Sequence, residues 1–199
     1  IDLPRPLAPG KKVVFELDWH YKITDHGAVG GRSGYSTFEK GDADIFFLAQ
    51  WFPRMAAYTD YAGWQHKQFL RRGEFTLEFG DYDVTLTVPA DHIVSSTGSL
   101  ENGNEVLTKT QLKRLTSAND KAPVFIVTPE EALKKEKKST DKTSSWHFKA
   151  ENVRDFAWSS SRKFTWDAMI HNQPGAKYAQ VLAMSFYPNE AEPIWSHYS

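Results

Sequence analysis

The chain has 199 residues, of which 40% are apolar and 25% charged, proportions that are typical of a globular protein and argue against disorder. The formal net charge of -1 provides no overall field to attract nucleic acid or an anionic membrane. Cysteine is absent, which excludes disulfides, thiol nucleophiles and cysteine-ligated zinc but does not decide the compartment, cytoplasmic or exported. No apolar run approaches the roughly 18–20 residues of a membrane helix. We therefore expect a soluble protein with neither a nucleic-acid nor a membrane partner.

The first ten residues resemble the interior of a longer chain. The first residue is Ile1 rather than Met, and three prolines lead to Gly10 without a signal-peptide pattern. We therefore expect a fragment that lacks the native start.

Three strand-like patterns and one loop follow in the first half of the chain. Residues 13–23 alternate apolar and polar side chains, the period of a half-buried strand. Residues 27–34 contain four glycines and predict a loop. Residues 44–50 form a short apolar run that predicts a strand buried on both faces. Residues 75–79 and 83–89 predict a strand pair, the second with Val84, Leu86 and Val88 on one face.

The middle of the chain predicts a hairpin and two short helices. Asn102-Gly103 is a strong hairpin signal between the strand patterns of residues 92–98 and 105–108. Residues 110–118 predict a helix capped by Thr110. Thr128, followed by Pro and two Glu residues, predicts the start of a second helix. The lysine-rich residues 134–142 contain no interleaved aromatic side chains and predict a solvated surface loop.

Strand patterns return in the last third of the chain. Residues 145–150, 154–160 and 179–187 predict strands, the last of them buried, and residues 189–198 predict a helix. The expected fold class is mainly β, a large antiparallel sheet or sandwich with one or two short helices. We expect residues 1–187 to form one β-rich domain.

The sequence contains no complete catalytic or metal-binding motif. None of the seven histidines begins the His-Glu-x-x-His pattern of a zinc protease, and no two lie four residues apart. Asp91-His92 with Ser95-Ser96 suggests a serine hydrolase, but the Gly-x-Ser-x-Gly elbow is missing and a structural role is favoured. We therefore expect no catalytic residue, no metal ligand and no cofactor within this chain.

Aromatic side chains are unusually common, with 7 Trp, 8 Tyr and 13 Phe. Exposed rings stack on sugars, so a carbohydrate- or peptide-binding β-sandwich module is the alternative interpretation. Large rings also pack across strands, and core packing is the favoured reading. The exposure of five tryptophans decides between these interpretations: Trp51, Trp64, Trp146, Trp158 and Trp166.

Two stretches are more specific than composition. The first, residues 50–60, begins Gln-Trp-Phe-Pro-Arg and is followed by Gly63-Trp64, Lys67 and the strand pair that ends at Pro89. The second, residues 152–158, contains Arg-Asp-Phe-Ala-Trp. In order and spacing, both resemble the amino-terminal domain of the aminopeptidase N and leukotriene-hydrolase family of zinc peptidases, over residues 7–187.

This resemblance implies a saddle-shaped β domain, here without its first strands, that packs on a thermolysin-like catalytic domain and forms one wall of a peptide-binding site. It also implies that residues 188–199 begin the connection to that catalytic domain. The family's Gly-x-Met-Glu-Asn motif and His-Glu-x-x-His zinc site are both missing from the sequence. The resemblance therefore implies a non-catalytic domain whose parent aminopeptidase holds zinc elsewhere and releases amino-terminal residues from peptides.

Gln50 takes the position of the family's strand glutamine, which orients the substrate near its amino terminus. A neutral amide suits this task because it bonds a peptide backbone without adding charge. A purely local role for Gln50 at the end of a strand is the other interpretation. Some family members add an acidic residue two positions later, where this chain has Phe52. We expect Arg54 and Asp60 to form a structural ion pair.

Overall fold

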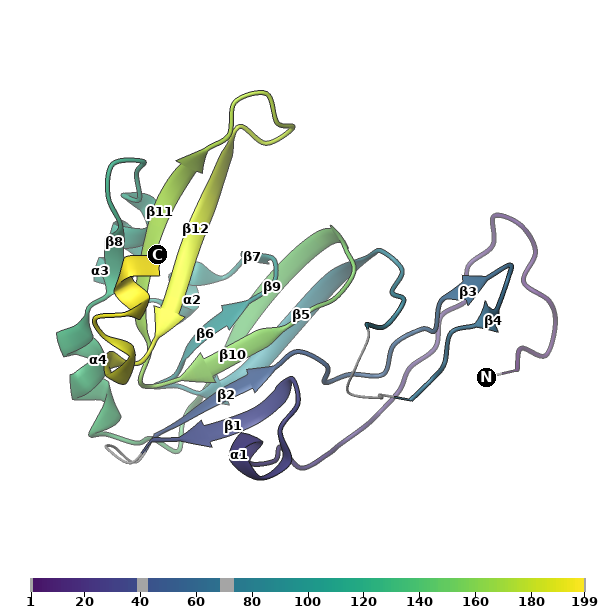
Figure 1. The fold of residues 1–199 in the computed structure, drawn as a ribbon, viewed down its shortest axis with the longest axis horizontal. Helices are drawn as coiled ribbons and strands as arrows, with labels where there is room; N and C mark the ends of the chain where they lie inside the picture. The colour runs from purple at the N-terminus through teal and green to yellow at the C-terminus, as the bar shows by residue number, and fades with distance from the viewer. Residues whose placement is uncertain (1, 39–42, 69–73, 199) are drawn as a thin grey trace.

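The computed structural model describes residues 2–38, 43–68 and 74–198, and these residues form a mainly β fold (Figure 1). The described strands make four antiparallel sheets, with the orders β1-β2-β10-β6, β12-β11-β8, β5-β9-β7 and β3-β4. The expected fold class is therefore confirmed, although the β structure is divided among several sheets.

The strands have the following bounds: β1 Ser33–Thr37, β2 Asp44–Leu48, β3 Tyr58–Thr59, β4 Gly63–Trp64, β5 Gly80–Pro89, β6 Ile93–Ser96, β7 Ser99–Leu100, β8 Val124–Val127, β9 Thr143–Val153, β10 Trp158–Ser161, β11 Thr165–Asn172 and β12 Gln180–Tyr187. The helices are short: α1 His26–Val29, α2 Gly103–Val106, α3 Lys109–Thr116 and α4 Pro129–Glu136, followed by the 3-10 turns η1 Asn189–Ala191 and η2 Trp195–Tyr198.

The long pair β5 and β9 shows the alternation that the sequence predicts. Leu86 and Val88 of β5 are buried, whereas Thr85 and Thr87, which alternate with them, face solvent. Leu86 lies opposite Trp146 of β9, which is also buried. One face of this ribbon therefore contributes directly to the core.

The hydrophobic core lies where the sheets and α4 meet. Its buried members come from β5, β6, β8, β9, β11, α4 and the loops between them: Leu86, Val88, Ile93, Val94, Leu107, Ile126, Val127, Ala132, Trp146, Phe148, Ala150, Phe156, Phe164, Trp166 and Ala168. Ile93 and Val94 of β6 are adjacent and both buried, as are Ile126 and Val127 of β8, so these strands are covered on both faces.

The predicted helix starts are partly confirmed. Thr128 caps α4 as expected: its hydroxyl accepts the Glu131 N–H at 3.3 Å, and the Glu131 carboxylate accepts the Thr128 N–H at 3.0 Å. The cap of α3 is Thr108 rather than Thr110, because Gln111 completes a capping box with Thr108.

The predicted Asn102-Gly103 hairpin is wrong, and residues 105–108 form no strand. Asn102 instead precedes the single turn of α2. Its side-chain amide donates to Ser145 O at 2.9 Å, and its oxygen accepts the His147 N–H at 2.9 Å. These two bonds hold the Asn-Gly pair against β9, so the chain reverses earlier, at Gly98 between β6 and β7.

Several other strand predictions are corrected by the structure. Residues 13–23 and 75–79 form no strand in it. The sequence patterns did not predict β1, β8 or β11. The strand β1 begins inside residues 27–34, which were predicted to be a loop, and α1 overlaps the start of the same range. The strand β12 is confirmed, but most of it is exposed rather than buried because β12 lies at the edge of its sheet. Residues 189–198 form two 3-10 turns interrupted by Pro193 rather than one helix.

Buried polar contacts hold the C-terminal segment to the body of the domain. Lys163 is completely buried, and its Nζ lies 2.8 Å from Glu190 in η1 and 3.3 Å from Glu136 at the end of α4. The Tyr187 hydroxyl donates to the Asp167 carboxylate at 2.9 Å. Burial and this hydrogen bond raise the pKa of Tyr187, so the phenol remains protonated at neutral pH.

Across the residues that the structure describes, no helix has the length and apolar character needed to cross a membrane.

Replacing Gly98 tests the reversal between β6 and β7. Gly98 has φ +87°, and an added Cβ would collide with the Lys149 carbonyl. Gly175 has a similar φ of +82° but open space around it. We expect Gly175→Ala to lower the free energy of unfolding by about 1 kcal/mol from backbone strain alone. Gly98→Ala should cost a further ~1–3 kcal/mol from the collision. Urea unfolding measures both, and equal losses would contradict the close packing at Gly98.

Candidate functional site

The ends of four strands form one row across the first sheet. Ser33 of β1 lies opposite Leu48 of β2, Leu48 opposite Trp158 of β10, and Trp158 opposite Ser96 of β6. A hollow of about 440 Å³ lies at this row. It is lined by Arg32, Phe47, Leu48, Ala49, Ser95, Ser96, Thr97, Ala157, Trp158 and Ser159. The lining combines apolar surface with several hydroxyl groups.

Gln50 lies two residues beyond Leu48 and is half-buried. The hydroxyl of Ser33 accepts the backbone N–H groups of Ala49 at 3.1 Å and Gln50 at 3.3 Å, which fixes the backbone as it leaves β2. Within the described part of the chain, the Gln50 side-chain amide makes no hydrogen bond, and Gln50 does not line the hollow. Its amide is therefore available to a ligand, as a substrate-orienting glutamine requires.

The two stretches on which the family resemblance depends meet in space. The Trp51 indole donates to the Phe156 carbonyl at 2.9 Å, across 105 positions in the sequence. Arg54 lies 2.8 Å from the Asp155 carboxylate, and both side chains are largely covered. The rings of Trp51 and Trp158 meet edge to face, with centroids 6.3 Å apart. The chain after Gln50 is thus anchored on the connection between β9 and β10.

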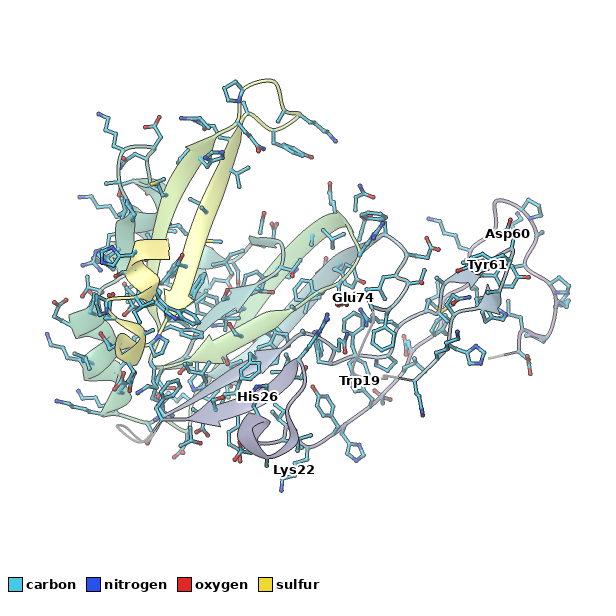
Figure 2. The ribbon with its side chains drawn as sticks, viewed as in Figure 1. Trp19, Lys22, His26, Asp60, Tyr61 and Glu74 are labelled. Carbon is cyan, nitrogen blue, oxygen red and sulfur yellow. The ribbon has the colours of Figure 1, made fainter. Side chains whose placement is uncertain are left out.

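The predicted ion pair between Arg54 and Asp60 is wrong. Residues 58–64, which form β3, β4 and the turn between them, make an arm that extends away from the other sheets. Asp60 is exposed in the turn of this arm (Figure 2). Arg54 instead pairs with Asp155, because the segment after β2 packs against the loop before β10 and brings that carboxylate into reach.

A second ion pair lies at the rim of the hollow. The Arg32 guanidinium donates two hydrogen bonds to Glu74, whose position is labelled in Figure 2. Hydrogen bonding from Arg32 lowers the pKa of the Glu74 carboxyl. Both side chains are exposed, so water and salt screen this pair strongly.

The tryptophans do not form a sugar-stacking row among the described residues. Trp146 and Trp166 are buried in the core, and Trp51 and Trp158 are half-buried with their ring planes at 86°. Trp64 is 57% exposed but packs edge-on against Tyr58, with ring centroids 5.1 Å apart. Most of these rings therefore stabilise the fold.

The side chains around His92 have structural partners. Asp91 pairs with Arg162 at 3.2 Å, and His92 Nδ1 lies 3.2 Å from the Ser160 hydroxyl rather than from Ser95 or Ser96. His92 is only 5% exposed, and its desolvation lowers its pKa. The arrangement therefore lacks the contact between a base and an accessible serine that a hydrolase needs.

In the described ranges, no group of three or more histidine, aspartate and glutamate side chains is placed to hold a metal ion.

Comparisons with models of protein families, with characterised proteins and with solved structures find no match for this chain.

Sequence patterns did not predict several residues of this site. Arg32 and Ser33 lie in a segment that predicts a glycine loop. Ser96 stands out in the sequence only beside Asp91-His92, as part of a serine-hydrolase pattern, and Thr97 only as part of a strand pattern. Their proximity depends on the pairing of four strands that are distant in sequence, so no local pattern indicated it.

A double-mutant cycle tests the anchoring of the chain after Gln50. We expect Arg54→Ala and Asp155→Ala to be coupled by about 1 kcal/mol in the free energy of unfolding, because the ion pair is largely covered. Arg54→Ala and Asp60→Ala should show no coupling, because these side chains do not meet. Chemical denaturation of the two cycles provides the measurement, and coupling to Asp60 alone would refute the assignment.

The depressed pKa of His92 predicts a pH-dependent stability. Burial makes protonation of His92 less favourable in the folded chain than in the unfolded chain, where the imidazole binds a proton below a pH of about 6.5. Stability is therefore unaffected well above pH 6.5 and falls as the pH drops below that value, by at most about 1.4 kcal/mol per pH unit. His92→Gln should remove this slope, whereas His171→Gln, at an exposed histidine, should retain it. Denaturation midpoints between pH 5 and 8 test this, and an unchanged slope in His92→Gln would contradict it.

Proposed function

We propose that this chain is the non-catalytic amino-terminal domain of a zinc aminopeptidase. In this proposal it packs on a catalytic domain and supplies one wall of the site at which amino-terminal residues are released from peptides. The contact of residues 51–54 with residues 155–158 supports the proposal, because both segments on which the family resemblance depends belong to one structural unit.

The observation that carries the proposal is an exposed apolar surface on β12. Leu182 and Met184 lie on the same face of β12 and are 38% and 42% exposed, and no charged residue interrupts the strand. Leu182 and Met184 also line a hollow of about 390 Å³, together with core side chains such as Phe148 and Trp166. Contiguous apolar surfaces of this kind are typical of faces that another domain covers.

Gln50 is the residue of this chain that we assign to substrate binding. Its side-chain amide can donate to and accept from a peptide backbone, and the Ser33 hydroxyl holds its backbone in place. Phe52 has no carboxylate to pair with a free α-ammonium group, so we assign that contact to the catalytic domain.

The described side chains do not fit a zinc site, since they contain no group of three suitable ligands. We therefore place the ion in the catalytic domain and assign no chemical step to this chain. Its proposed contribution is to orient the peptide and to cover one side of the reacting groups.

The parent polypeptide that contains residues 1–199 tests the proposal. We expect it to bind one zinc per chain and to release the chromophore from aminoacyl-anilide substrates, whereas residues 1–199 alone should do neither. Metal analysis and a spectrophotometric assay measure both properties. Tight zinc binding and turnover by residues 1–199 alone would refute the proposal, and so would an inactive, zinc-free parent.

Substitution of Gln50 tests its assigned role within the parent enzyme. We expect Gln50→Ala to raise KM by about 3- to 10-fold, the effect of losing one neutral hydrogen bond to substrate. The control is Gln68→Ala, at an exposed glutamine outside the strand-end row, which should leave KM unchanged. An unchanged KM for Gln50→Ala would assign that side chain a purely local role.

A further inference from the structure

The hollow of about 440 Å³ lies over one face of the four-stranded sheet. Residues that lie opposite each other in a sheet share a face, and every second residue of a strand returns to that face. One set of such residues crosses the sheet from β1 to β6: Gly34, Phe47, Ser159 and Ser95.

A second set lies beside the first, because the hydrogen-bond ladder continues one step beyond the strands. The Ala49 N–H donates to the Arg32 carbonyl at 3.2 Å. The Thr97 N–H likewise donates to the Ala157 carbonyl at 2.9 Å. These four residues are two positions away from the first set along their strands, so their side chains share its face.

Small side chains on this face leave the room for the hollow. Ala49 and Ala157 form an alanine floor at its centre, and Phe47 is the largest apolar side chain of this face. The His26 ring meets the Phe47 ring edge to face, with centroids 5.0 Å apart, and holds it in place (Figure 2 labels His26). The volume is within the range of small-molecule sites.

The polar groups of the hollow are unequally engaged. Of the described residues that line it, only Arg32 carries a charge. The Thr97 hydroxyl is already used, since it accepts the Ala157 N–H at 3.1 Å. In contrast, the half-buried Ser95 and Ser159 make no side-chain hydrogen bond within the described part of the chain. Two hydroxyl groups are therefore available to a ligand.

Arg32 is placed to bind a carboxylate, as its contact with Glu74 shows. The guanidinium donates two hydrogen bonds to that carboxylate, the forked geometry that arginine and carboxylates prefer. The Arg32 and Glu74 side chains are 49% and 69% exposed. Because exposed ion pairs are weak, another carboxylate can replace Glu74 on Arg32 at little cost.

We propose that this hollow binds an organic acid, with its carboxylate on Arg32, its apolar body over the alanine floor and a hydroxyl or amide group near Ser159. The strands β1 and β6 are three strand spacings apart, roughly 14 Å, of which the long Arg32 side chain covers a part. Glu74 competes with the ligand for the guanidinium. The carboxyl-terminal residue of a peptide has the same chemistry as a free acid. The proposal uses only residues of this chain and is independent of the proposed function.

Titration of residues 1–199 with 3-(4-hydroxyphenyl)propanoate tests the proposal. Backbone amide chemical shifts at residues 95–97 and 157–159 report on the hollow. We expect this acid to bind at least about 10-fold more tightly than 3-(4-hydroxyphenyl)propanamide, which has the same shape without the charge. N-acetyl-Gly-Tyr and its amide are the corresponding peptide probes. Whichever of the two acids binds more tightly identifies the source of the carboxylate, and either order supports the proposal.

Three variants separate the roles of the charged residues. Arg32→Gln should weaken binding of the acid at least about 10-fold and remove its advantage over the amide. Glu74→Gln should strengthen binding of the acid by about 2- to 5-fold, because it removes the competitor. The control is Arg5→Gln, at an exposed arginine that does not line the hollow, which should change neither affinity.

The opposite effects of Arg32→Gln and Glu74→Gln distinguish a binding site from a general loss of structure, which would weaken binding in both. Equal affinities of the unmodified chain for the acid and the amide would overturn the proposal. So would chemical-shift changes that leave residues 95–97 and 157–159 unaffected. An unchanged affinity for the acid in Glu74→Gln would refute the competition between Glu74 and the ligand.

Discussion

The contact between residues 51–54 and residues 155–158 is the constraint on which the arrangement of the candidate site depends. The Trp51 indole bonds the Phe156 carbonyl, and Arg54 pairs with Asp155. The first interaction joins the residues that follow β2 to the residues that precede β10. The second joins a residue further along the chain, nearer β3, to the same loop. Because both partners are largely covered, each bond is protected from competition with water. The position of Gln50 follows from this anchoring and from the Ser33 hydroxyl.

The anchored segment also supports a residue that is distant in sequence. The Trp19 indole donates to the Trp51 carbonyl, and the two rings lie 6.2 Å apart. Elsewhere in the fold, β12 has one neighbouring strand among the described residues and exposes Leu182 and Met184. Exposed apolar side chains favour association with another surface. This face of β12 therefore supports the proposal that the chain works as part of a larger protein.

Local patterns predicted those elements whose stabilising contacts lie close in sequence. Thr128 and Glu131 are three residues apart and form the capping box of α4 without help from the rest of the chain. The alternation of apolar and polar side chains in β5 also predicted a strand, because one face of β5 packs on the core and the other is exposed to solvent. Asn102 shows the opposite case. Its strong local preference for a hairpin turn is overridden by two hydrogen bonds to β9, about 45 residues away.

The choice of Gln50 as a candidate ligand-binding residue rests on the resemblance to a known family. The sequence by itself determined the fold class and the absence of a complete catalytic motif. These follow from side-chain periodicity, residue type and spacing, which are local properties. Only the tertiary structure decided that Arg54 pairs with Asp155 rather than Asp60, and that Ser33, Leu48, Trp158 and Ser96 share one row. Strand pairing joins residues at separations that no local pattern encodes, because the register depends on how all the apolar faces are buried together.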